Sequence, residues 1–129
     1  MRWALPLCAG LAGCATPSGI AGPVAGQYGG AHIGLNIGPS GGTIEYDCAT
    51  GTIAAILPDA AGRFVSEGTR RPEHGGPSRV GEVLPTLRVR FDGAVRGDQL
   101  SLRGRIENGV LLGPFDLRRG APPQILRCL

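Results

Sequence analysis

The chain has 129 residues, which is room for one domain, and 42% of them are hydrophobic, enough for a core of modest size. Its thirteen basic residues are all arginine, against ten acidic residues, and the net charge is +3. Arg2 lies in a segment that we expect to be removed, so the mature surplus of positive charge is smaller and is spread along the chain. Composition therefore excludes a second independent domain and does not favour nucleic acid as a partner.

Residues 1–13 have the layout of a lipoprotein signal peptide. A positive start at Arg2 precedes an apolar run over 3–12, which is far shorter than the roughly 20 residues of a membrane-spanning helix. The sequence Leu-Ala-Gly-Cys at 11–14 resembles the lipobox of bacterial lipoproteins, in which the cysteine receives a diacylglyceryl group and becomes the new N-terminus. Two alternatives stay open: an ordinary cleavage site at 13–15, and a cytosolic chain whose first helix only resembles a signal.

The position after the lipobox bears on localisation. If Cys14 carries the lipid, we expect an exported protein that is anchored to a bacterial membrane on its periplasmic side. Ala15, rather than Asp, follows the cysteine, so the outer membrane is the expected location in a host with two membranes. Residues 14–25 are rich in Pro, Gly, Ser and Ala without periodicity and are predicted to form a flexible tether, and residues 26–129 a β domain.

The cysteines predict one disulfide in the folded part. Cys8 leaves with the signal and Cys14 takes the lipid, so Cys48 and Cys128 remain in an oxidising compartment, where two thiols are expected to pair. A bridge across 80 residues is worth about 4 kcal/mol in the chain-entropy model. A metal-binding thiolate pair and a redox C-x-x-C motif both require closer spacing than this.

Apolar residues alternate with polar or small residues over five stretches of the domain, which is the signature of half-buried strands. The alternating positions are Ile33, Leu35 and Ile37; Ile44, Tyr46 and Cys48; Leu87, Val89 and Phe91; Leu100, Leu102 and Ile106; and Leu111, Phe115 and Leu117. Turn chemistry separates them at 38–42, 58–59, 97–98, 107–109 and 120–123, and Asn108-Gly109 is a strong hairpin signal. No segment shows a helical stripe.

These patterns predict an all-β fold. Seven or eight short strands joined by tight turns form an antiparallel meander, and closing it into a barrel would leave no sheet edge exposed. A β-sandwich is the alternative. The one long irregular stretch runs over 68–86, and loops of such length often carry function.

Four short motifs carry a resemblance to a known family. They are Gly-Gln-Tyr-Gly-Gly-Ala-His at 26–32, Asp-Cys-Ala-Thr-Gly-Thr-Ile at 47–53, Glu-His-Gly-Gly-Pro at 73–77, and the terminal Cys-Leu. The domain resembles a family of small secreted bacterial proteins without an established activity, from which it departs by Tyr28 in place of Trp. The resemblance supports the domain and the disulfide. In architecture alone, the chain is also similar to periplasmic inhibitors of lysozyme and of proteases.

Polar residues at the start of the domain form the first candidate site. On a strand, His32 would share a face with Gly34 and lie beside Glu45 or Asp47, if the strand pairs with the next one. This group could be a ligand or metal site. It could equally be a solvated outer face, or a structural hydrogen bond from His32 to the backbone.

The long loop forms the second candidate site. Arg70, Arg71, Glu73 and His74 could present a basic and imidazole-bearing surface to an envelope protein, a glycan or anionic lipid. The histidines stand at no metal-ligand spacing, so we expect neither a metal nor a cofactor, and the case for an enzyme is weak. The sequence favours a small binding module on the cell envelope. The alternatives are an inhibitor of an extracellular hydrolase, and a metal-dependent enzyme using His32 and His74.

Overall fold

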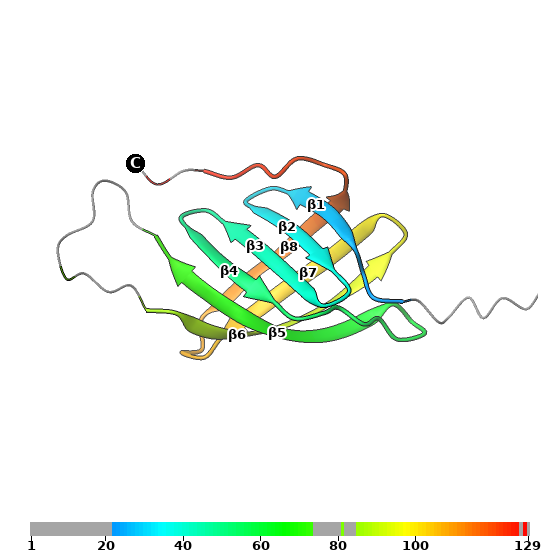
Figure 1. Ribbon diagram of the computed structural model, residues 1–129, viewed down its shortest axis with the longest axis horizontal. Coiled ribbons are helices and arrows are strands. Elements are labelled where there is room, and N and C mark those ends of the chain that lie inside the picture. The colour runs from blue at the N-terminus through cyan, green and yellow to red at the C-terminus, as the bar shows by residue number, and fades with distance from the viewer. Residues whose placement is uncertain (1–21, 74–80, 82–84, 127, 129) are drawn as a thin grey trace, which may run out of the picture.

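The computed structural model describes residues 22–73, 81, 85–126 and 128, which form one closed antiparallel barrel (Figure 1). Each strand pairs with the next along the chain, and the last pairs with the first. The strands are β1 (Gly26–Gly30), β2 (Ile33–Gly38), β3 (Gly41–Tyr46), β4 (Ala49–Ile53), β5 (Arg63–Pro72), β6 (Leu87–Arg96), β7 (Gln99–Ile106) and β8 (Leu111–Arg119). The predicted all-β barrel of seven or eight strands is confirmed, and the sandwich alternative was wrong.

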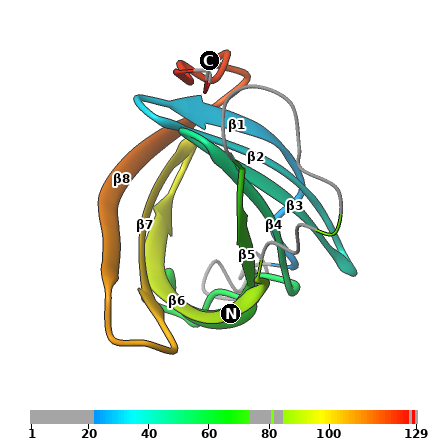
Figure 2. The ribbon, with the colours of Figure 1, turned by 90° about the vertical axis from the view of Figure 1, so that its left-hand side faces the viewer.

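The up-and-down order of the strands gives the barrel two distinct ends. At the entry end, the described chain leads into β1 and leaves β8 at Gly120. At the rim end lie the β1–β2 turn (31–32), the β3–β4 turn (47–48), the end of β5, the start of β6 and the β7–β8 turn (107–110). Figure 2 looks onto the rim end, where the strands form a ring.

Alternating side chains from all eight strands fill the barrel. Tyr28, Ile33, Ile44, Phe91 and Leu102 are almost completely buried in a single hydrophobic cluster. Burial of such side chains is the main favourable term in folding, at about 25 cal/mol per Å² of apolar surface. The cluster therefore fixes which face of each strand points inward.

The core also includes a residue that precedes the first strand. Val24 lies inside the range that we assigned to the tether, but its side chain is buried and its N–H donates a hydrogen bond to the carbonyl of Ile56, 3.0 Å away. The barrel therefore holds the chain from Val24 onward. Across the residues described, no helix is long and apolar enough to cross a membrane.

The prediction of an irregular stretch from 68 was wrong over its first five residues, which belong to β5. Gly68, Arg70 and Pro72 occupy the inward positions here, in register with Ile53, Gly51 and Ala49 of β4. None of the three is a large apolar residue, so the strand carries no hydrophobic alternation. Backbone pairing on both sides builds it instead.

Leu111 was predicted to point inward and is instead exposed. The register between β7 and β8 shifts between Leu102 and Gly104, where β8 accommodates one extra residue. Because side chains alternate with a period of two, one extra residue moves the following positions to the opposite face. Leu112, rather than Leu111, therefore packs against the core.

We expect Phe91→Ala to lower the free energy of unfolding by about 3–5 kcal/mol, because it empties a fully buried position in a closely packed barrel. Val65→Ala on the neighbouring strand is the control, because Val65 is 56% exposed, and it should cost less than about 1 kcal/mol. Urea unfolding of the two variants measures both values. Similar losses would contradict the assignment of inward and outward faces.

Candidate functional site

The segment after β8 turns back and crosses the outside of the barrel from the entry end to the rim end (Figure 1). It passes so close to β1 and β2 that only glycine fits beneath it. A Cβ atom on Gly29 would lie 2.3 Å from the Ala121 carbonyl oxygen, and one on Gly34 would lie 2.7 Å from the Pro123 side chain. These two glycines form the seat of this C-terminal tail (121–126 and 128).

Backbone hydrogen bonds fasten the tail to the β1–β2 turn. The N–H of His32 donates to the carbonyl of Gln124, 2.8 Å away, and the N–H of Gln124 donates to the carbonyl of Gly30, 3.0 Å away. Ala31 and Gln124 form a parallel bridge. The tail thus extends the edge of the hairpin by a short stretch of pairing.

The β3–β4 turn holds the tail a second time. Asp47 uses both carboxylate oxygens: Oδ2 lies 2.6 Å from Nδ1 of His32, and Oδ1 accepts a hydrogen bond of 2.7 Å from the N–H of Leu126. The next residue, Cys48, lies at disulfide distance from Cys128, with the Cα atoms 5.1 Å apart. We call Asp47 with its two partners the tail clamp.

The two turns of the tail clamp contain the only non-glycine residues with positive φ in the described chain. His32 has φ 68° and Cys48 has φ 57°, a conformation that costs an L-residue roughly 1–2 kcal/mol. Residues keep such conformations only where surrounding contacts over-determine them. Here those contacts are the bonds from both turns to the tail.

His32 therefore lies in a turn, not on the strand where we had placed it, because its left-handed backbone ends the extended run. Its predicted nearness to a carboxylate is found, but with Asp47 alone. Glu45 lies on the outer face of β3, in register with Gly34 and Thr50. The structural hydrogen bond predicted for His32 was to the backbone, whereas its ring here lies 2.6 Å from the carboxylate of Asp47, and the ligand-site interpretation stays a prediction.

Asp47→Ala should lower the free energy of unfolding by about 1–3 kcal/mol, because two hydrogen bonds are lost. It should also raise hydrogen exchange at the Leu126 amide, while the disulfide still links the tail to the β3–β4 turn. Asp92→Ala is the matched control, because Asp92 pairs only with the exposed side chain of Arg103, and it should cost less than about 1 kcal/mol. An unchanged Leu126 amide in Asp47→Ala would refute the clamp.

The remaining predicted residues gather around the same end. A groove of about 580 Å³ runs between the tail and β3–β4 and is bordered by the Glu45 and Glu73 side chains and by the disulfide. The N–H of Glu73 donates to the carbonyl of Cys48, 2.8 Å away. Arg71 is outward-facing and in register with Thr50, which separates it from Glu45. His74 lies outside the described residues.

Arg70 differs from its neighbour because it points into the barrel. Its guanidinium carbon lies 5.5 Å from the centre of the Tyr46 ring, and that ring packs at 6.2 Å from Phe115. Within the described chain, Arg70 Nε and the Tyr46 hydroxyl are buried without a hydrogen-bond partner. Tyr46 is the residue that the sequence reasoning missed, since its alternation with Ile44 marked it only as core.

A second arginine–tyrosine pair lies at the entry end. The Arg119 guanidinium carbon lies 5.0 Å from the centre of the Tyr28 ring. Two acceptors lie near the Arg119 guanidinium: Nη1 donates to the carbonyl of Ala25, and Nε lies 3.5 Å from the Asp98 carboxylate. Each end of the barrel thus has an arginine beside a buried tyrosine, although Arg119 is itself exposed.

Burial raises the pKa of both tyrosines, because an ionised phenol loses its hydration inside the barrel. The nearby Arg119 and Arg70 lower these pKa values and offset burial only in part. The raised pKa keeps the Tyr46 hydroxyl protonated at ordinary pH. It is therefore available there as a hydrogen-bond donor.

These shifts make stability depend on pH in the alkaline range. The unfolded chain releases tyrosine protons above about pH 10 while folded Tyr46 retains its proton, so the free energy of unfolding should fall as pH rises, by up to about 1.4 kcal/mol per pH unit for Tyr46. Tyr46→Phe should make this fall less steep between pH 10 and 11.5, as measured by urea unfolding. An unchanged slope would show that Tyr46 ionises equally in both states.

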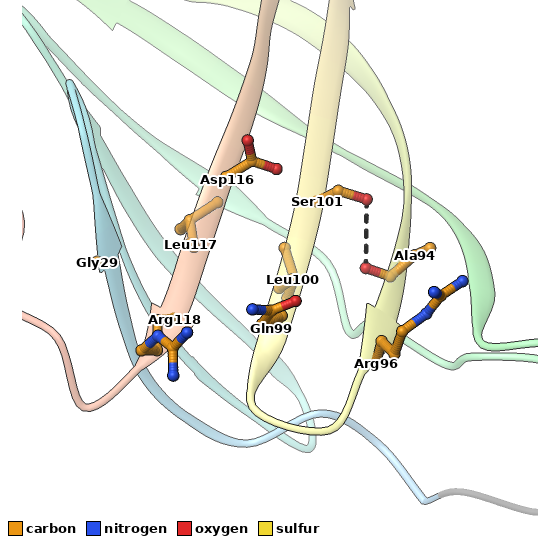
Figure 3. Close-up of a pocket in the computed structure, with 9 residues that line it drawn as sticks. All are labelled: Gly29, Ala94, Arg96, Gln99, Leu100, Ser101, Asp116, Leu117 and Arg118. Atoms are coloured by element: carbon orange, nitrogen blue, oxygen red, sulfur yellow. Dashed lines mark hydrogen bonds between the residues drawn. The ribbon is translucent and has the colours of Figure 1, made fainter.

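A second hollow lies outside the predicted set, on the outer face near the entry end (Figure 3). It measures about 600 Å³ and spans β6, β7, β8 and β1. Small residues at Gly29, Ala94 and Ser101 form its floor, and Arg96 and Arg118 flank it. Small outward residues on adjacent strands were its only signal in the sequence, and without the register they could not be brought together.

Among the described residues, no group of three or more His, Cys, Asp or Glu could hold a metal ion. No family model, no curated protein and no solved structure matches this chain. The resemblance to the secreted bacterial family therefore stays a prediction.

Proposed function

We propose that this protein is an exported binding module, anchored to a bacterial membrane by lipid on Cys14, whose rim end engages a component of the cell envelope. The observation that carries the proposal is the opposite placement of attachment and candidate surface. The chain enters the barrel at Val24, at the entry end, while His32, Asp47, Arg71 and Glu73 lie at the rim end. A tether at the entry end would leave the rim end facing away from the membrane.

The rigidity of the rim end supports the same proposal. Two turns, the tail and the disulfide hold one another there, so the backbone around the groove has little freedom to lose on binding. Preorganisation of this kind raises affinity because less conformational entropy is lost in the complex. The carboxylates of Glu45 and Glu73 border the groove, and Arg71 adds a cation nearby.

Site-specific photo-crosslinking in the host tests this surface. A photoreactive residue at Val110, which is 52% exposed at the rim end, should capture one envelope component in a saturable manner. The same residue at Leu57, which is 63% exposed in the β4–β5 connection at the entry end, is the matched control and should not capture it. The same product from both positions would refute a rim-end surface.

Membrane fractionation tests the anchor separately. Cys14→Ala should move the protein from the membrane fraction to the soluble periplasmic fraction, because one lipid-bearing cysteine is the proposed attachment. Mass spectrometry of the wild-type protein should show a diacylglyceryl group on Cys14. A Cys14→Ala variant that stays with the membrane would contradict the proposed anchor while leaving the crosslinking result to stand by itself.

A further inference from the structure

Each end of the barrel has an arginine beside a buried tyrosine, but the polar contacts of the two arginines differ. At the entry end, Arg119 lies over Tyr28 and is supplied with a carboxylate by Asp98 and a carbonyl by Ala25. At the rim end, Arg70 lies over Tyr46, and no carboxylate of the described residues lies within ion-pair distance of it.

The unsatisfied polar groups of Arg70 and Tyr46 lower the stability of the folded barrel. Tyr46 is only 5% exposed, and its hydroxyl and the Arg70 Nε are both buried without partners in the described chain. Buried polar groups in folded proteins nearly always have a hydrogen-bond partner, and an unsatisfied one costs about 1–3 kcal/mol. Arg70 Nε can only donate, and the Tyr46 hydroxyl can donate as well as accept, so a single acceptor would satisfy both groups.

We propose that Arg70 and Tyr46, at the rim end, bind a carboxylate carried on an apolar stem. Two observations and one general property of guanidinium groups favour this chemistry. Asp98 supplies a carboxylate to the equivalent arginine at the entry end. One guanidinium balances one negative charge and matches the two oxygens of a carboxylate. Half-buried Leu87 and Phe115 beside the pair offer apolar contact to the stem.

This inference rests on the proposed function, because it names the chemistry that the rim end recognises. The carboxylate comes from a small molecule or from the chain terminus or side chain of a partner protein. Binding is measured on the purified full chain without membrane or partner. A failure here therefore leaves the crosslinking contrast between Val110 and Leu57 intact.

Isothermal titration of the full chain with hexanoate tests the proposal. We expect saturable binding of one hexanoate, with a change in tyrosine ultraviolet absorption as the hydroxyl gains an acceptor. Tyr46→Phe and Arg70→Gln should each weaken binding at least tenfold. Tyr28→Phe removes the matching buried hydroxyl at the entry end and should leave the affinity unchanged. An apolar peptide with a free carboxyl terminus, compared with its amide, distinguishes a protein source from a small molecule.

Several outcomes would overturn the proposal. They are no binding of hexanoate at millimolar concentration, equal effects of Tyr28→Phe and Tyr46→Phe, and inorganic phosphate binding as tightly as hexanoate. Glu82, in a segment outside the described residues, gives a further test. Binding that appears only in Glu82→Gln would also overturn the proposal, because the chain would then supply the carboxylate itself. Because Arg70→Gln could impair folding, thermal unfolding accompanies it, and Tyr46→Phe, which removes one oxygen, carries the test without it.

Discussion

The closure of the barrel depends on a short seam between its first and last strands. Tyr28, Gly29 and Gly30 of β1 pair with Arg119, Arg118 and Leu117 of β8, a shorter ladder than those joining the long central strands. An open seam would expose two sheet edges. The chain strengthens this weak point with the segment that follows β8, which crosses β1 over the bare backbone of Gly29.

The tail can stabilise the pairing of β1 with β8 only if its far end is held in place. The tail clamp and the disulfide hold that end. A link between positions 48 and 128 removes much of the conformational entropy of the unfolded chain, worth about 4 kcal/mol. The same contacts hold His32 and Cys48 in left-handed conformations. The rigidity that makes the rim end suitable for binding is thus a consequence of how the barrel is kept closed.

Local pattern in the sequence predicted the fold where side chains alternate by size and polarity, and failed where they do not. Strands with Leu, Ile and Phe at every second position were recognised, as was the pairing of the two cysteines. The second half of β5 was missed, because glycine, arginine and proline fill its inward positions. The exposure of Leu111 was missed because it depends on a register shift, which only the partner strand reveals.

The candidate site shows the same division. Sequence reasoning brought His32 near Asp47 by pairing two strands, although His32 and Asp47 lie in the turns that flank these strands. It could not assign the second oxygen of Asp47 to the tail, 79 residues away along the chain. Nor could it separate Arg70 from Arg71, although one enters the barrel and the other faces solvent. The difference follows from the alternation of side chains along a strand, which turns Arg70 inward and Arg71 outward. The inward guanidinium lies beside a buried hydroxyl and needs an acceptor, whereas the outward one can be hydrated.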